Sequence, residues 1–291
     1  MSSVLFGVIY FMTEQPRFDD SSELVPHRNF TIPFNYVWER ESKRWIPMEE
    51  GFGGSHLDSI TFQASDFIHK FGSNPELKQQ NVSINNPETI WDGSFHYVFP
   101  SDSGEPLKVA SSDNSDNQEI VVIGLDENFI EKTWTGNLTG QTPVDLDGLW
   151  TRVYRMYNND SVSLSGDAEV KKFDLSECYA KMLDGNNQTL MALYTIPADK
   201  IGYLTRYSLS AQNTSSSSTI HFTAQIRTRE FGKVFRTREI VSFGTSHDTE
   251  RILQFPTKLQ PKTDIIFQVV SSDGNNGAVN ADFDIALHDL T

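Results

Sequence analysis

Cysteine is almost missing from this chain of 291 residues, in which Cys178 stands alone. A single cysteine cannot form a disulfide within the chain, so the fold must rest on packing, and we expect synthesis in a reducing compartment. No catalytic signature surrounds Cys178 in the stretch Asp174–Met182. We therefore interpret this thiol as a buried side chain and not as a nucleophile.

Long apolar runs are also missing. The run Val4–Phe11 is apolar but too short to span a bilayer. It lacks the basic residues and the small-residue cleavage site of a signal peptide. The sequence thus predicts neither a membrane span nor export.

Basic residues are scarce. The chain contains 24 Lys and Arg but 39 Asp and Glu, which gives a net charge of -15. Affinity for nucleic acids depends mainly on cations that neutralise phosphates, so we expect no nucleic-acid partner. A large negative charge keeps a concentrated protein soluble and repels polyphosphate.

The familiar catalytic motifs are absent: HExxH, CxxC, GxSxG, the Walker A sequence, and GxGxxG after a strand. Seven histidines are scattered, and none pairs with another at metal-ligand spacing. Asp113, Ser115, Asn117 and Glu119 alternate oxygen ligands, but Gln118 stands where a calcium loop needs glycine, which favours an ordinary turn. We predict no enzymatic activity, no cofactor and no metal.

Bulky residues suited to a sheet are plentiful, with 20 Phe, 9 Tyr and 5 Trp. Alternation is clear in Ile220–Ile226 and in Ala281–Leu287, where every second residue is apolar. Such strands, separated by turn residues, recur from Pro87 to the end of the sequence. The sequence therefore predicts a mainly β protein, an antiparallel β-sandwich or jelly roll.

Two short helices are also predicted. One is Ser65–Phe71, where Ser65 can cap the first turn, and the other is Ser176–Leu183. Glu230–Lys233 is expected to form a tight turn between two long strands.

The expected domains are an N-terminal arm and docking segment, residues 1–86, and a β-sandwich body, residues 87–291. An alternative divides the body into two β subdomains, 87–188 and 189–291. The first segment is rich in aromatics and poor in periodicity, so it can hardly close a core of its own. We expect an extended arm that docks through aromatic side chains: Phe30, Phe34, Tyr36, Trp38 and Trp45.

Basic residues cluster around one turn of this acidic chain. The expected assembly contacts on the two flanking strands are Arg227, Arg229, Arg236 and Arg238. A basic hairpin can meet an acidic patch of a neighbouring subunit. Pairing with Glu230 and Glu239 of the same molecule is an equally favoured alternative, and phosphate binding comes third.

Several runs of the second part resemble a known group of proteins. They are ETIWDGSFHYVFPS (88–101), LKVASSD (107–113), VVIGLD (121–126), LYTIPADKIGY (193–203) and PKTD (261–264). Together they resemble structural proteins of marine tailed bacteriophages such as cyanophages, over roughly residues 88–291. The resemblance implies a virion component, such as a capsid knob, decoration or fibre-like protein, and homotrimers are common among such proteins. It implies no catalytic residues.

The function expected from these observations is that of a structural virion subunit, assembled in the host cytoplasm. Its partners would be further copies of itself, in a trimer, and other virion proteins, either the major capsid protein or neighbouring tail and neck proteins. The alternative is a tail- or collar-associated protein that binds a host receptor or carbohydrate. Loops at 111–118, 213–218 and 274–277 would then carry the binding site.

Overall fold

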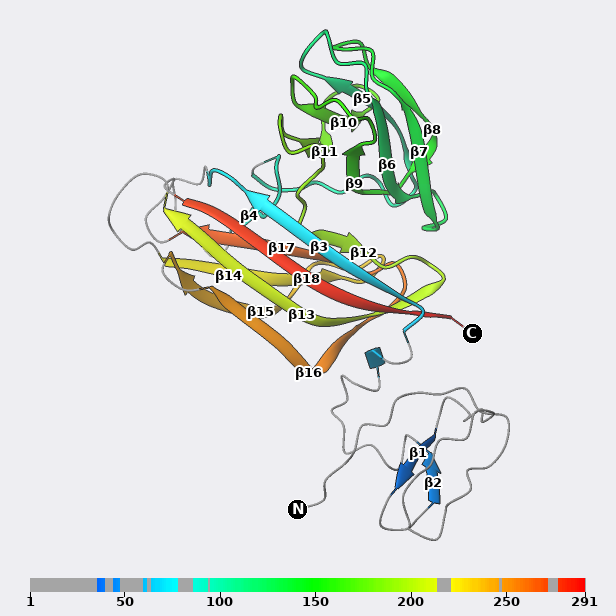
Figure 1. Ribbon diagram of the computed structural model, residues 1–291, viewed down its shortest axis with the longest axis vertical. Coiled ribbons are helices and arrows are strands. Elements are labelled where there is room, and N and C mark those ends of the chain that lie inside the picture. Colours follow the sequence, from blue (N-terminus) through cyan, green and yellow to red (C-terminus); the bar gives the residue numbers. More distant parts are fainter. Residues whose placement is uncertain are drawn as a thin grey trace. The chain divides into compact units, whose positions relative to one another are not determined.

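The computed structural model describes residues 60–61, 64–77, 86–93, 95–213, 221–245, 248–271 and 277–290, and the backbone of 36–39 and 44–47. The regular secondary structure of the described residues is almost entirely β-strand, and all the named strand pairs are antiparallel (Figure 1). The predicted fold class is thereby confirmed. Contacts divide the chain into residues 1–55 and 56–291, which are described separately.

A four-stranded and a five-stranded sheet in residues 56–291 have the strand order of a jelly roll. One sheet runs β16-β13-β18-β3 and the other β12-β17-β14-β15, and the short strand β4 also pairs with β17. Leaving out the short β4, successive strands of these sheets alternate between them, except that β14 and β15 form a hairpin within one sheet. This is the double Greek key of an eight-stranded jelly roll.

The bounds of its strands are β3 (Asp66–Asn74), β4 (Glu88–Thr89), β12 (Leu193–Thr195), β13 (Lys200–Asn213), β14 (His221–Arg229), β15 (Arg236–Gly244), β16 (Thr249–Leu259), β17 (Asp264–Ser271) and β18 (Gly277–Asp289).

Alternating side chains hold the two jelly-roll sheets together. The predicted inward face of β18 is confirmed, because Ala281, Phe283, Ile285 and Leu287 are at most 2% exposed. The Phe283 ring stacks on Phe267 of the opposite sheet, with ring centroids 4.8 Å apart. Burying such a side chain stabilises the fold by about 1.5–3 kcal/mol before the cost of ordering it.

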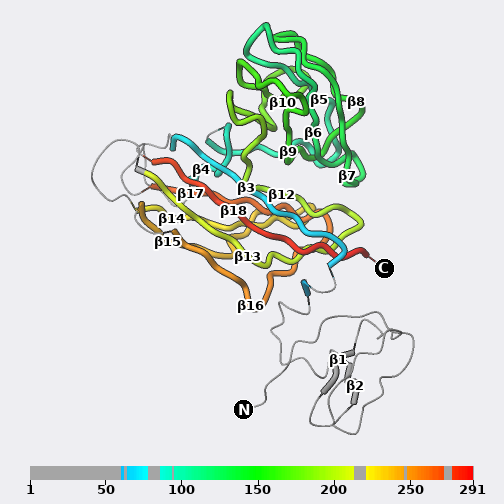
Figure 2. Tube along the Cα trace, viewed as in Figure 1, coloured from blue at the N-terminus to red at the C-terminus, as the bar shows by residue number. Residues whose placement is uncertain are grey.

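A second group of strands is inserted between β4 and β12. It forms the sheets β11-β10-β5-β8 and β7-β6-β9. The strands are β5 (Glu105–Ser111), β6 (Glu119–Leu125), β7 (Glu131–Asn137), β8 (Val144–Trp150), β9 (Arg152–Asn158), β10 (Ala168–Lys172) and β11 (Cys178–Met182). We call residues 95–190 the insert; Figure 2 traces it in the green part of the chain.

The N-terminal part shows one hairpin. Strands β1 (Tyr36–Glu39) and β2 (Arg44–Pro47) pair antiparallel and place Trp38 opposite Trp45.

Both predicted helices are wrong. Residues 66–74 form β3, which pairs along β18 and so belongs to the jelly roll and not to a docking segment that ends at residue 86. Residues 178–182 form β11, which pairs with β10. In both stretches a sheet neighbour supplies backbone hydrogen bonds that outweigh a weak local preference for helix.

No helix of the described residues is both long and apolar enough to cross a membrane.

Candidate assembly surface on the β14–β15 hairpin

The turn between β14 and β15 is the tight turn that the sequence predicts. The Lys233 amide donates a 2.9 Å hydrogen bond to the Glu230 carbonyl. Gly232 lies in the left-handed region with φ +70°, a conformation that glycine adopts without steric cost. We call residues 230–236, from this turn to the start of β15, the hairpin tip.

The hairpin tip presents cations and apolar side chains together. Lys233 and Arg236 are exposed, and neither makes an ion pair with any residue that the structure describes. Phe231 is 50% exposed and Val234 is 74% exposed. In a chain that carries a net charge of -15, two uncompensated positive charges beside apolar surface are typical of a protein contact.

Aromatic packing holds the hairpin tip against the insert. The Phe231 ring meets Phe129 edge to face with centroids 5.4 Å apart, and Phe235 lies 5.7 Å from Phe99. The Arg229 guanidinium lies over both Phe99 and Phe235, at 5.0 and 5.1 Å from the ring centroids. The tip is therefore a fixed surface and not a loose loop.

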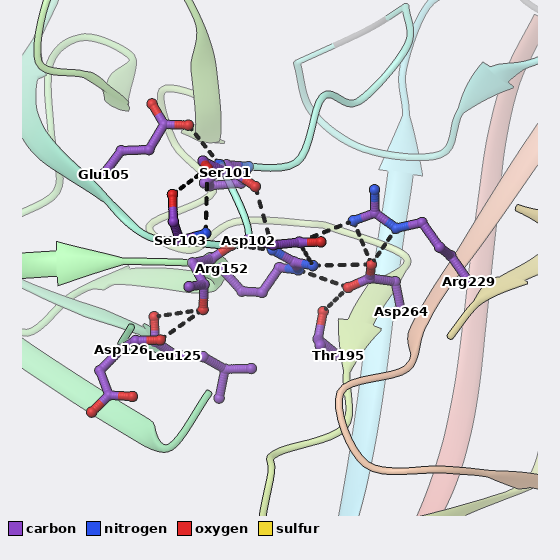
Figure 3. A network of polar contacts seen from close by, with 12 residues as sticks. Ser101, Asp102, Ser103, Glu105, Leu125, Asp126, Arg152, Thr195, Arg229 and Asp264 are labelled. Carbon is purple, nitrogen blue, oxygen red and sulfur yellow. Dashed lines mark hydrogen bonds and ion pairs between the residues drawn. The ribbon is translucent and has the colours of Figure 1, made fainter. Parts of the chain in front are cut away.

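A buried ionic network lies under the hairpin tip, where two guanidinium groups converge on the Asp264 carboxylate (Figure 3). Arg152 Nε donates to Asp264 Oδ1 at 2.7 Å and its Nη2 to Oδ2 at 3.1 Å. Arg229 Nε donates to Asp264 Oδ2 at 2.7 Å, and the Thr195 hydroxyl donates to Oδ1 at 2.6 Å. Arg152 Nη2 also donates to Asp102 at 2.7 Å. Two arginines thus balance two carboxylates.

The centre of this network, the Arg152–Asp264 pair, is almost fully withdrawn from solvent, whereas the Arg229 and Asp102 side chains are 23% and 37% exposed. The side chains of Arg152 and Asp264 are 2% and 1% exposed. Burial alone would lower the pKa of Arg152, but the Asp264 carboxylate, with Asp102, holds it above the ordinary value. The pair therefore stays charged and ties the insert, through β9, to strands β14 and β17 of the jelly roll.

The four predicted arginines have different surroundings. Arg229 belongs to the buried network, and Arg227 Nη1 donates to Gln268 of the same sheet at 3.1 Å. Arg238 donates to Thr228 and lies 3.7 Å from Glu230. Only Arg238 has a partner that the intramolecular alternative named, Glu230. Arg229 and Arg227 have other partners in the same chain, and Glu239 pairs with Arg251. Arg236 is exposed.

The other predicted contacts stay predictions. Phe30 and Phe34 lie outside the described residues. Tyr36, Trp38 and Trp45 lie on β1 and β2, of which only the backbone is described.

Sequence reasoning missed the partners of the hairpin. Asp264 is the first residue of β17 and Arg152 the first residue of β9, and each is a charge beside apolar residues of its strand. That break in the pattern is the signal that could have marked them, because a charge that is buried needs a partner.

The acidic turn at 113–119 is closed by its own hydrogen bonds. Asp113 Oδ1 accepts from the Ser115 amide and hydroxyl, and the buried Asp116 carboxylate accepts from Ser111, Ser165 and Gly166. No cluster of three or more potential metal ligands occurs among the described residues.

A groove with a volume of about 250 Å³ is lined by residues of β5 and β10, among them Lys108, Ala110 and Lys171. Lys108 in its wall pairs with Asp145 at 3.2 Å, and Lys171 pairs with Glu169 at 2.5 Å. Ser111 and Ser112, from one of the loops that the binding alternative predicts, also line it.

Comparison with known proteins adds little. No protein-family model matches the chain, and no curated protein matches it. Among solved structures, that of the Gt strain of infectious bursal disease virus is 10% identical, covers 78% of both chains and has a TM-score of 0.18. Particles derived from the same virus, with a T=1 lattice, are 11% identical, cover 78% of this chain and 74% of that one, and also score 0.18. Likenesses this low carry no argument about function.

Proposed function

We propose that this chain is a non-enzymatic structural subunit of a tailed-phage virion, a capsid-associated knob, decoration or head-fibre subunit that acts by assembling with other copies of itself and with virion proteins. The observation that carries the proposal is the hairpin tip. It combines uncompensated cations and exposed apolar side chains on a base fixed by buried ion pairs.

Fixed surfaces suit assembly because little entropy is lost when they bind. The exposed Phe231 and Val234 supply apolar area, and Lys233 and Arg236 supply charge that selects an acidic partner. The jelly roll agrees with this role, since viral capsid proteins are often built from it, although lectins are too. The fold by itself therefore does not decide between the two.

The resemblance of residues 88–291 to structural proteins of marine tailed phages is what favours a virion over other assemblies. That resemblance also favours a trimer.

The first test measures the mass of the full chain in solution, by sedimentation velocity from nanomolar to micromolar concentration. We expect a discrete homo-oligomer, with a trimer as the expected form. A chain that stays monomeric over the whole range would overturn the proposal. A second test adds the chain to phage particles that lack it and expects saturable, stoichiometric binding.

A second candidate is a tail- or collar-associated receptor- or carbohydrate-binding protein. The groove beside Ser111 and Ser112 favours it, with the exposed Phe173 close by, under the Lys108 amine. The ion pairs of Lys108 and Lys171 leave little uncompensated charge there, so a neutral glycan would suit the groove best. Binding on a glycan array, lost in Phe173→Ser, would support this candidate; an array without signal would exclude it for the glycans tested.

A further inference from the structure

The outer face of the sheet β16-β13-β18-β3 is a second surface with an unusual composition. Its side chains form rows across the strands, because the register places Phe71 opposite Asp282 and His69 opposite Asp284. Asp284 in turn lies opposite Arg206 of β13, and Arg206 opposite Ile252 of β16. We call this surface the acidic face.

On the acidic face, one arginine pairs with three carboxylates. Arg206 donates to Glu250 and Asp282, both at 2.5 Å, and lies 3.4 Å from Asp284. Among these four side chains, three carboxylates and one guanidinium leave an excess of two negative charges. The Asp284 carboxylate also bonds His69 Nδ1 at 2.6 Å.

Exposed apolar side chains flank these charges. Phe67 is 58% exposed and Phe71 is 42% exposed on β3, and Ile252 is 60% exposed on β16. Apolar side chains exposed next to charges can serve a protein contact, because the apolar area leaves water on binding and the charges select the partner.

From this match we propose that the hairpin tip of one copy docks on the acidic face of a second copy of the chain. The tip offers two uncompensated positive charges, Lys233 and Arg236, and the face offers an excess of two negative charges. Each surface also offers exposed apolar side chains, so contact removes apolar area from water on both sides. The inference deepens the proposed function and rests on it.

The two surfaces are different patches of one chain, so the contact is head to tail. A head-to-tail contact closes into a ring when its rotation allows, and a ring of three would give the expected trimer. Such a ring uses every hairpin tip and every acidic face once.

A charge-reversal cycle tests the contact in the full chain. Variant K233E/R236E reverses the tip, and variant E250K/D284K reverses the face while keeping the Arg206–Asp282 pair. Each variant should associate on the order of a hundredfold more weakly than wild type, because like charges then meet. The variant with all four substitutions restores opposite charges and should assemble again.

Folding is checked by near-ultraviolet circular dichroism and by the melting temperature of each variant. A folded variant with one reversed surface that keeps the wild-type mass would overturn the contact, and so would a folded quadruple variant that stays dissociated. In both cases the wild type is still an oligomer, so the proposed function survives. A monomeric wild type would instead remove both.

A measurement on the wild type needs no variant. Carbodiimide joins an amine to a carboxylate that touches it, so it should link Lys233 to Asp282, Asp284 or Glu250. Mixing chains labelled with heavy and light nitrogen shows whether the link lies between copies. We expect isotopically mixed cross-links, and their absence from a cross-linked oligomer would contradict the proposal.

Discussion

Arg152 and Asp264 form a bidentate ion pair between the insert and the jelly roll, although 112 residues separate them in the sequence. A buried pair of this kind adds little net stability compared with apolar residues, but removing one partner leaves an uncompensated charge. The pair therefore fixes which strands meet, and it supports the hairpin tip through Arg229.

The first prediction concerns this pair. Arg152→Met leaves the two carboxylates of the network, Asp264 and Asp102, with Arg229 as their one cation, so one negative charge stays uncompensated and we expect the free energy of unfolding to fall by about 3–5 kcal/mol. Urea unfolding measures the change. The control is Arg155→Met, an exposed arginine on the same strand, for which we expect a change within about 0.5 kcal/mol. Equal losses in both variants would contradict a special role for the pair.

Lys70 gives a prediction at alkaline pH. Its side chain is buried, and the amine donates to the Tyr154 carbonyl of the insert. Burial, with Arg155 nearby, lowers the pKa of Lys70 from 10.5 to about 7. Between these values the unfolded chain holds a proton that the native chain lacks, so stability rises with pH, by up to about 1.4 kcal/mol per pH unit.

Lys70→Met removes this titration. Unfolding free energies measured between pH 7 and 10.5 should rise with pH in the wild type relative to the variant. Two parallel curves would show that the amine titrates alike in both states.

For Asp92 we expect the opposite dependence at acid pH: stability falls as the pH rises. One of its carboxylate oxygens accepts a hydrogen bond from the Leu190 amide, and the other has no partner among the described residues. Burial raises the pKa of Asp92 from 3.8 to about 7, against the effect of that hydrogen bond. Between these values the native chain holds the extra proton, so stability falls as pH rises.

Asp92→Asn keeps the shape and one acceptor but does not titrate. The wild type should therefore lose stability relative to this variant as the pH is raised from 3.8 to about 7. Chemical unfolding at several pH values checks this, and a constant difference between the two proteins would refute it.

At Gly72 of β3 the neighbouring backbone leaves no room for a side chain. A Cβ atom there would lie 2.1 Å from the Ala192 amide nitrogen and 2.6 Å from the Ile90 carbonyl oxygen, both backbone atoms. We expect Gly72→Ala to cost about 1–3 kcal/mol or more of unfolding free energy. The neighbouring Ser73→Ala, whose backbone hydrogen bond to Leu190 stays, serves as the control. A thermal melt that is the same for both variants would contradict the close packing of β3.

The thiol of Cys178 is predicted to react slowly. Burial, with Glu169 nearby, raises its pKa from 9.0 to about 12. The thiolate is then about a thousandfold rarer at neutral pH, so alkylation by iodoacetamide should be slow in the native chain and fast in denaturant. Equal rates in both states would show that the thiol is accessible and not perturbed.

The fold class and the strands with clean alternation can be predicted from the sequence. The order of the strands in the sheets cannot. In β18 the alternation of Ala281, Phe283 and Ile285 marks the inward face directly. In β3 a lysine, Lys70, stands at an inward position, which hides the period of two. A buried amine looks like a solvated one in a sequence, because its partner lies in a distant segment.

The candidate surface is predictable only in part. The turn at Glu230–Lys233 and its basic flanks follow from residue types. Which arginines form ion pairs within the chain depends on Asp264 and Glu230. These carboxylates reach Arg229 through the tertiary fold and Arg238 through the hairpin geometry. Local patterns contain no information on such distant pairings.

The pairing of β3 with β18 has a consequence for synthesis. His69 and Asp284, which face each other across these strands, are 215 residues apart. The ribosome must therefore make almost the whole fold before β3 finds its neighbour, and until then β3 is an unpaired strand with aromatic side chains. Nascent chains of this protein are for that reason expected to bind chaperones until β18 has emerged, when the jelly roll can close.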